Sequence, residues 1–172
     1  MQKIAWVLAG VVLFCAPALA QQSAPFVDLA GNYSYLRASE TKSNYNGASV
    51  SLSINTNQWL GLVADVGGYH QAVPARAESA NIVTYLLGPR VYYREDQRIT
   101  PFVQTLLGGA HNTLTGQSSI ALTAGGGFDV KIDPRVSLRV IQAEYLMTRF
   151  GTVTQNNMRI SAGIVFHFGG VR

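Results

Sequence analysis

Three histidines are the first residues of this chain to consider for chemistry, because an imidazole can act as a base, a proton shuttle or a metal ligand. His70 and His111 lie near the ends of two apolar segments, and His167 falls near the opposite end of the expected molecule, where we expect it to lack partners. A serine hydrolase needs a serine and an acid within hydrogen-bond reach of its histidine. Neither His70 nor His111 has a serine nearby on the same strand face. We therefore expect no catalytic residues, no metal site and no cofactor.

Charged side chains offer a second kind of chemistry. They alternate with bulky apolar residues and so share one face of their segments. This set consists of Asp28, Asp65, Arg90, Arg94, Asp129, Lys131, Arg139, Glu144 and Arg159. If that face lines a narrow interior, opposite charges can pair across it, and Arg90 is the expected centre of the network. An ion path is the alternative, but a charge network that fills the interior fits a small barrel better.

The elements that would position these residues have a side-chain period of two, and the last segment, 159–168, shows it most clearly. One face of this segment consists of Ile160, Ala162, Ile164, Phe166 and Phe168, and the other of Arg159, Ser161, Gly163, Val165 and His167. This pattern predicts a strand with one apolar face and one mixed face.

Seven further segments have strand character, which gives eight in total. The eight segments cover about 26–36, 48–54, 60–67, 82–94, 101–111, 122–132, 136–147 and 159–168. Polar stretches at 39–47, 71–80, 112–119 and 149–157 alternate with tight turns at 56–58, 95–97 and 133–135, and predict loops at one end and turns at the other. Loop residues such as Asn44, Tyr45 and Asn46, or residues 115–118, are candidates for binding a surface partner.

Several irregularities are expected within these strands. Pro89 lacks a backbone donor, which predicts a bulge or local kink. Arg139 and Gln142 share a face only if one extra residue is absorbed near 140–142, which predicts a β-bulge. The face of segment 101–111 is ambiguous because Leu106 and Leu107 are adjacent, and the glycines at 125–127 indicate close packing or a bend of the wall.

The amino terminus resembles a secretory signal peptide, with Lys3 before an apolar run and small residues ending at Ala20. We expect cleavage after Ala20, which leaves one domain at 21–172 with no thiol, because Cys15 is the chain's single cysteine. Without Lys3 the 13 Lys and Arg become 12 against 9 Asp and Glu, a net charge of +3. These basic residues are scattered, so we expect no nucleic-acid partner.

The order of strands and turns, the glycine segment 125–130 and the closing segment 163–168 resemble the small outer-membrane β-barrel family, which includes the OmpA transmembrane domain and OmpX-like proteins. The resemblance covers 21–172. It implies an all-β, eight-stranded, antiparallel, up-and-down transmembrane barrel in the outer membrane of a Gram-negative-type bacterium.

The same resemblance implies three kinds of partner: outer-membrane lipid, the barrel-assembly machinery and periplasmic chaperones. Ile164, Phe166 and Phe168 would form the terminal-strand assembly signal. Aromatic residues are expected at both membrane interfaces. The expected inner belt is Trp59, Tyr93, Phe102, Phe166 and Phe168, and the expected outer belt is Tyr33, Tyr35, Tyr69 and Tyr145.

Three functions remain open from the sequence. We expect a structural or surface-interaction role without catalysis, in which the barrel anchors its loops at the cell surface. The alternatives are a narrow pore for ions or small solutes and a lipid-modifying hydrolase. A soluble lipocalin-like barrel is the competing fold, but it would turn its apolar face inward, whereas the mixed face here is rich in Gly, Ser and charge.

Overall fold

The computed structural model describes residues 24–38, 43–71, 80–95, 98–113, 116–150 and 153–169. The predicted signal peptide at 1–20 lies outside these residues and stays a prediction. In the described part of the chain, no helix is long and apolar enough to cross a membrane. The strands are β1 (Val27–Ala38), β2 (Ser43–Asn55), β3 (Leu60–Gln71), β4 (Ala80–Tyr92), β5 (Ile99–Asn112), β6 (Gln117–Asp133), β7 (Val136–Phe150) and β8 (Val153–Phe168).

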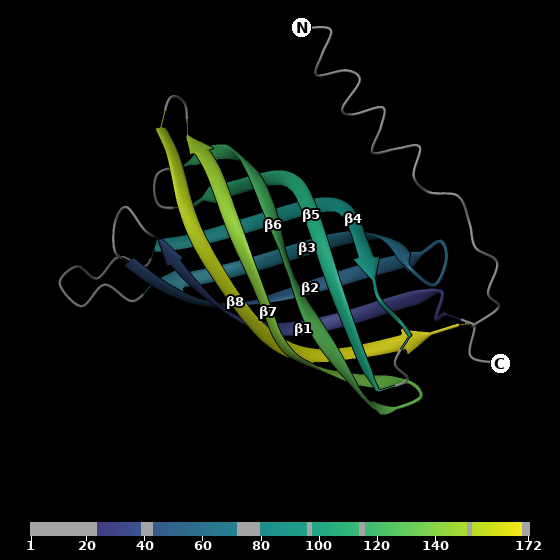
Figure 1. Cartoon of the computed structure of the whole chain (residues 1–172). Coiled ribbons are helices and arrows are strands. Elements are labelled where there is room, and N and C mark those ends of the chain that lie inside the picture. The colour runs from purple at the N-terminus through teal and green to yellow at the C-terminus, as the bar shows by residue number, and fades with distance from the viewer. Residues whose placement is uncertain are drawn as a thin grey trace, which may run out of the picture.

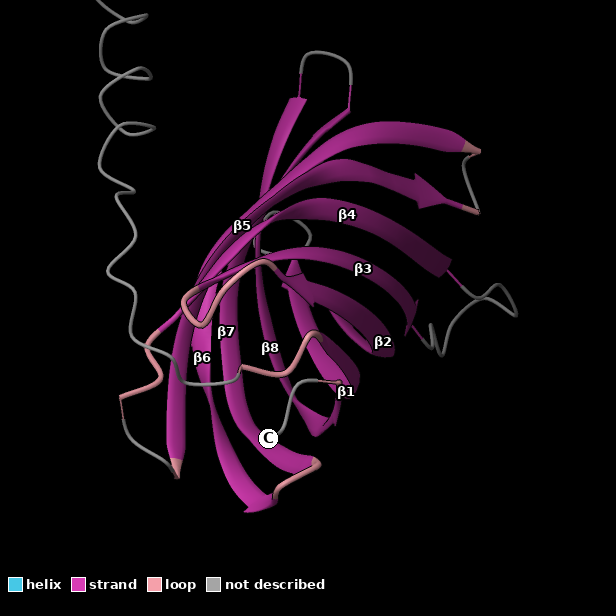
Figure 2. Cartoon of the chain, turned by 90° about the vertical axis from the view of Figure 1, so that its right-hand side faces the viewer, coloured by secondary structure: helices cyan, strands magenta, loops and turns pink. Residues whose placement is uncertain are grey.

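The strands close into a barrel in which each pairs antiparallel with its neighbours, and β1 also pairs with β8. Figure 1 shows the barrel from the side, and Figure 2 shows the strands curving around a common interior. We call the end with the short turns and with residues 26 and 169 the turn end, and the other the loop end. Closure leaves no unpaired strand edge, as a bilayer requires. The expected eight-stranded up-and-down barrel is confirmed.

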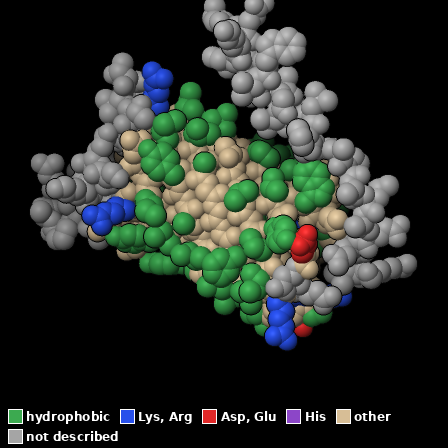
Figure 3. All heavy atoms as spheres, viewed as in Figure 1, with side chains coloured by type: hydrophobic (Ala, Val, Ile, Leu, Met, Phe, Trp, Pro, Cys, Tyr) green, Lys and Arg blue, Asp and Glu red, His purple; other side chains and the backbone are tan. Residues whose placement is uncertain are grey.

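The side chains alternate between the interior and the outer surface. In β2, Ser51 and Ser53 are buried, whereas Val50 and Leu52 are 55% and 42% exposed. Figure 3 shows hydrophobic side chains over the side of the barrel and charged ones toward its two ends. The apolar face therefore points outward, opposite to a lipocalin-like barrel, because the surroundings of the wall are hydrocarbon rather than water.

The strands extend further toward the loop end than we expected from the sequence. β2 begins at Ser43, β6 at Gln117 and β8 at Val153, all within stretches predicted as loops. The strands contain 12 to 17 residues, whereas a tilted strand crosses the hydrocarbon core in about 9 to 11. Beyond the membrane a ladder can continue with polar residues on both faces, so polarity alone did not mark the strand ends.

A β-bulge interrupts β7 where the sequence predicted one extra residue. Val140 and Ile141 stand opposite a single residue of β8, Ala162. Both are exposed on the outer face, while Arg139 and Gln142 on either side are buried. The predicted bulge is confirmed, and it restores both polar side chains to the interior.

Of the bulge or local kink expected at Pro89, the bulge is wrong and the kink stays a prediction. Leu87 pairs with Leu107 and Arg90 with Gln104, so the register of β4 against β5 is the same on both sides of the proline. Pro89 is exposed on the outer face. A proline removes one donor from the ladder without requiring an inserted residue.

Close packing at 125–127 is confirmed. A Cβ on Gly125 would lie 2.2 Å from the carbonyl oxygen of Ala143, and one on Gly127 would lie 2.3 Å from that of Ile141. Both contacts are with the backbone of β7, which cannot move aside as a flexible side chain could. The glycines therefore permit β6 to approach the bulged strand.

The predicted aromatic belts need two corrections. Phe102 and Tyr69 are 3% and 2% exposed and face the interior rather than lipid. Phe102, Gln104 and Leu106 alternate along β5 and are all buried, so the even-numbered residues of this part of the strand face the interior. This resolves which face of segment 101–111 points inward. Tyr69 lies inward because Asp65, on the same face of β3, is also buried. Other predicted belt residues are exposed at the two ends, namely Tyr33, Tyr93, Tyr145, Phe166 and Phe168.

Candidate functional site

The interior is the candidate site, and one part of it is apolar. This apolar layer consists of Leu36, Tyr45, Val63, Tyr69, Leu86, Leu106, Ala110, Ala121 and Leu146. We did not predict it, although Leu146 shares strand parity with Glu144 and Leu36 shares it with Asp28. Tyr45 belongs to this layer, so it is not a loop ligand, whereas Asn44 and Asn46 are exposed in β2.

Glu144 of β7 is the side chain on which the polar contacts in the middle of the barrel converge. Arg159 Nε of β8 donates to Glu144 Oε2 at 2.6 Å, and Gln142 Nε2 donates to the same oxygen at 2.8 Å. Gln104 Nε2 of β5 donates to Oε1 at 2.6 Å. Three donors from three strands thus surround a carboxylate that is 2% exposed, as a buried charge requires.

Arg159 joins this carboxylate to β3. Its Nη1 donates to Asp65 Oδ1 and to the Tyr69 hydroxyl, each at 2.9 Å. Arg159 and Asp65 are each 1% exposed. One guanidinium therefore bridges two carboxylates on strands that lie on different sides of the barrel.

A second buried pair lies on β6 and β7. Arg139 donates through Nε and Nη2 to the two oxygens of Asp129 at 2.8 and 3.0 Å, the two-point geometry that suits a guanidinium and a carboxylate. Its Nη1 also donates to Gln142 Oε1 at 2.9 Å. The guanidinium carbons of Arg139 and Arg90 lie 4.6 and 4.5 Å from the centre of the Phe102 ring.

Arg90 is not the centre that we expected. Its Nε donates to Gln104 Oε1 at 2.6 Å, but among the described residues no carboxylate lies within ion-pair distance of it. Its positive charge is instead stabilised by the rings of Phe102 and Tyr92 and by the side-chain oxygen of Gln104. Glu144 has the central place because three strands direct donors toward it.

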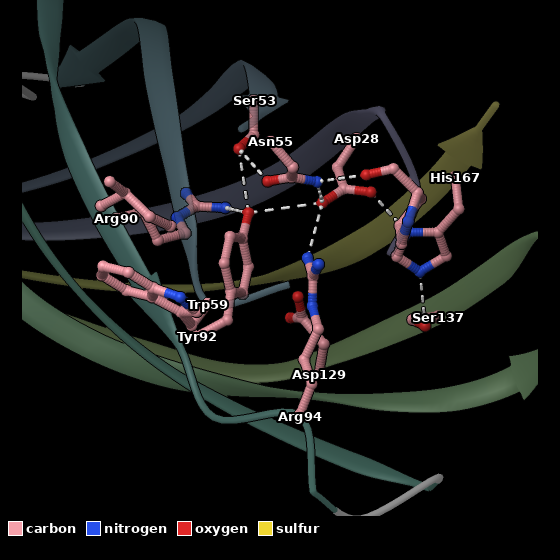
Figure 4. Close-up of polar contacts among 12 residues, drawn as sticks. Asp28, Ser53, Asn55, Trp59, Arg90, Tyr92, Arg94, Asp129, Ser137 and His167 are labelled. Carbon is pink, nitrogen blue, oxygen red and sulfur yellow. Dashed lines mark hydrogen bonds and ion pairs between the residues drawn. The ribbon is translucent and has the colours of Figure 1, made fainter. Parts of the chain in front are cut away.

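At the turn end, Asp28 of β1 collects a third group of contacts (Figure 4). Asn55 Nδ2 donates to Asp28 Oδ2 at 2.8 Å, and Arg94 Nη2 and the Tyr92 hydroxyl donate to it at 3.3 Å each. His167 Nδ1 lies 2.6 Å from Asp28 Oδ1. The expectation that His167 lacks partners is wrong, because closure of the barrel places β8 beside β1.

Of the nine charged residues predicted to share the interior, seven are buried, and Arg94 is 15% exposed at the mouth. Lys131 is the exception: it is exposed near the β6–β7 turn, so its assignment to the buried network is wrong. A register shift between Lys131 and Asp133 accompanies this change of environment. Sequence reasoning also missed the neutral members Gln104 and Tyr92, whose strand parity was the available signal, whereas Gln142 was expected to face the interior.

The loop-end histidines each contact one polar side chain. His70 Nδ1 lies 2.7 Å from Asn81 Oδ1, and His111 Nδ1 lies 3.0 Å from Ser118 Oγ. Ser118 lies opposite His111 on the neighbouring strand, so the residues of one strand face do not reveal the contact. Among the described residues, no group of three or more His, Cys, Asp or Glu is arranged to hold a metal ion.

The terminal-strand residues Ile164, Phe166 and Phe168 lie on the outer face and are 47%, 44% and 52% exposed. Phe168 pairs with Val27 at the closing seam, and Gly169 follows with a φ of 70°. The strand therefore ends at its last aromatic residue, beside the first strand of the barrel.

The comparison with known families agrees with this geometry. Residues 6–168 match the family described as outer membrane protein beta-barrel domain. The chain belongs to this family. As an outer-membrane barrel it resides in the outer membrane of a Gram-negative bacterium, with its apolar outer face toward membrane lipid. No curated protein matches the sequence.

Several solved structures of small outer-membrane proteins have the same fold as this chain. OprG of Pseudomonas aeruginosa has a TM-score of 0.59 and 8% identity, and covers 87% of this chain and 98% of its own. Neisserial surface protein A has a TM-score of 0.55 and 20% identity, over 83% and 96%. Ail, the attachment invasion locus protein of Yersinia pestis, has a TM-score of 0.52 and 16% identity, over 85% and 100%. At these identities the likeness concerns the fold alone.

Proposed function

We propose that this outer-membrane barrel has a structural or surface-interaction role. The barrel, whose interior is filled and does not conduct ions, anchors its loop end at the cell surface. The observation that carries the proposal is the interior. It holds the apolar layer and, beside it, ion pairs that involve Asp28, Asp65, Asp129 and Glu144. A continuous ion path needs a wet lumen, and these side chains occupy the space it would need.

The orientation is the first part of this proposal to test. Because the predicted mature chain has no thiol, Asn44→Cys at the loop end and Asn57→Cys at the turn end each give one exposed labelling site. On intact cells, a membrane-impermeant maleimide should label Asn44→Cys but not Asn57→Cys, and both should react after the outer membrane is permeabilised. Labelling of Asn57→Cys alone on intact cells would reverse the orientation.

The pore remains the alternative from the transport class. Purified protein reconstituted into planar bilayers should give no reproducible conductance steps, because charged and apolar side chains both fill the interior. Flotation of proteoliposomes serves as the control for insertion. Stable, uniform steps from inserted protein would favour the pore over the anchor.

Catalysis at the loop end has little support. A hydrolase that modifies lipid there would need an acid beside His70 or His111. Among the described residues, no carboxylate forms an ion pair with either histidine. We therefore propose a non-enzymatic loop end, whose exposed polar residues, such as Asn44 and Asn46, contact a surface partner. The names of Ail and Neisserial surface protein A are in keeping with such a role.

We also propose that the barrel-assembly machinery and periplasmic chaperones recognise Ile164, Phe166 and Phe168. All three project outward at the end of β8, where an unfolded chain could present them together. Phe168→Ala should lower the amount of folded barrel in cells but leave refolding in detergent unchanged. An equal loss in both settings would mean that Phe168 acts in folding rather than in recognition.

A further inference from the structure

Three side chains at the turn-end mouth have a spacing that the proposed anchoring role does not use. Ser137 Oγ of β7 lies 2.8 Å from His167 Nε2, and the other ring nitrogen, Nδ1, lies 2.6 Å from Asp28 Oδ1. Figure 4 shows the imidazole between the hydroxyl and the carboxylate. From this geometry we infer that Asp28, His167 and Ser137 form a Ser–His–Asp relay that makes Ser137 a nucleophile toward small carboxylic esters.

The polarity of the relay follows from Asp28. A carboxylate can only accept at its oxygens, so Nδ1 carries the hydrogen and donates to Oδ1. In the neutral ring, Nε2 then has a free lone pair and accepts the proton of the Ser137 hydroxyl, as a general base must. Asn55 and Arg94 both donate to Oδ2 of Asp28 and favour its charged form.

The barrel wall fixes the ring in this position. Asp28 and His167 are paired residues across the β1–β8 seam, and the backbone N–H of His167 donates to the carbonyl oxygen of Arg135 at 2.9 Å. Ser137 lies two residues after Arg135 on β7. Three neighbouring strands, β7, β8 and β1, therefore contribute one member each, and none of the members is on a loop.

The exposure of the three groups determines what can reach them. The side chain of His167 is 15% exposed, whereas Asp28 and Ser137 are 3% and 4% exposed as residues. The base thus faces the mouth, and the nucleophile lies just behind it. Because Ser137 is so little exposed, we expect an ester with a short acyl group to react and a lipid with two long chains not to reach the hydroxyl.

Arg94 supplies positive charge at the same mouth. It lies 3.3 Å from Asp28, and its buried Nη1 has no hydrogen-bond partner among the described residues. A cation here favours the negative charge that develops on the carbonyl oxygen of a bound ester. We assign Arg94 this electrostatic role and assign Asp28 the positioning of His167.

The reaction is an acyl transfer to water. Ser137 Oγ forms a bond to the ester carbonyl carbon while Nε2 takes the hydroxyl proton. The bond to the alcohol oxygen then breaks, the alcohol leaves with that proton, and an acyl-serine remains. Water, deprotonated by Nε2, attacks the acyl carbon, and the acid is released as Ser137 recovers its proton.

A small alkyl fluorophosphonate tests the nucleophile directly, because attack by Oγ forms a serine–phosphorus bond and releases fluoride. Folded wild-type protein in detergent should be modified at Ser137, located by peptide mass spectrometry, and Ser137→Ala should not be modified. The matched control is Ser161→Ala, since Ser161 is an equally buried interior serine that contacts Ser34 rather than a histidine. This control should react as fast as wild type.

The other two members are tested by rate. In folded protein, His167→Gln and Asp28→Asn should each react on the order of 100-fold more slowly than wild type, the contribution expected of a positioned base. Folding is checked in every sample by heat-dependent gel mobility. A folded wild-type barrel that is not modified at Ser137, or one whose rate is unchanged by His167→Gln, would mean that these contacts only brace the mouth and would overturn the proposal.

Discussion

Glu144 shows how much depends on one buried charge. Glu144→Gln removes the charge but keeps the shape, so Arg159 retains only Asp65 as a buried anionic partner. Breaking a buried pair from one side costs about 3 to 5 kcal/mol. We expect a lower urea midpoint for refolding in detergent. Adding Arg159→Met should lower the midpoint further, because it leaves the buried Asp65 carboxylate without its guanidinium. An unchanged midpoint for Glu144→Gln would contradict this account.

Arg90 should matter less, although the sequence made it the expected centre. Arg90→Ala removes the donor to Gln104 and the contact with the Phe102 ring, and should also lower the urea midpoint. Arg90→Met keeps most of the volume and should cost about 2 kcal/mol, less than Glu144→Gln, because Arg90 has no ion pair within the described residues. A larger loss from Arg90→Met than from Glu144→Gln would restore Arg90 as the centre.

At the scale of the element, β6 and β7 combine a close approach with an inserted residue. The bulge at Val140 and Ile141 was predictable because Arg139 and Glu144 have opposite parity and both carry charge that lipid would not accept. The short distance between the two strands was not predictable, since it depends on where the backbone of β7 lies relative to Gly125. Sequence parity thus located the irregularity, and the pairing of the strands determined its geometry.

Adding one methyl group to β6 at Gly125 tests its close approach to β7. In Gly125→Ala the new Cβ would meet the Ala143 carbonyl oxygen, so the ladder must shift, and we expect a loss of about 1 to 3 kcal/mol in refolding stability. Gly68→Ala is the matched control, because a Cβ there has nothing within 4 Å. Equal urea midpoints for the two variants would show that β6 has room that the structure does not indicate.

At the scale of the whole molecule, closure through β1 and β8 links every strand to two neighbours. Such a barrel should resist dodecyl sulfate until it is heated. We expect unboiled protein from the outer-membrane fraction to migrate faster on a gel than boiled protein, because the folded barrel is more compact. A single band whose mobility does not depend on heating would contradict a closed barrel.

The sequence by itself determined the parts of this protein that follow from local patterns: eight strands, an apolar outer face, the bulge in β7 and the inward parity of most charged residues. The period of two is a property of each strand alone, so it is visible without the fold. It does not say which side chains meet, nor where a strand leaves the membrane. Lys131 and Tyr45 were misplaced for that reason.

Only the tertiary structure decided the contacts across the barrel. Asp28 and His167 are 139 positions apart, and only closure of β1 on β8 makes them neighbours. Phe102 and Tyr69 look like interfacial aromatics in the sequence, yet both side chains point inward. Arg90 lies over the Phe102 ring, and Arg159 donates to the Tyr69 hydroxyl. Residues distant in the chain meet because the ring of strands fixes their register, and no local pattern records that register.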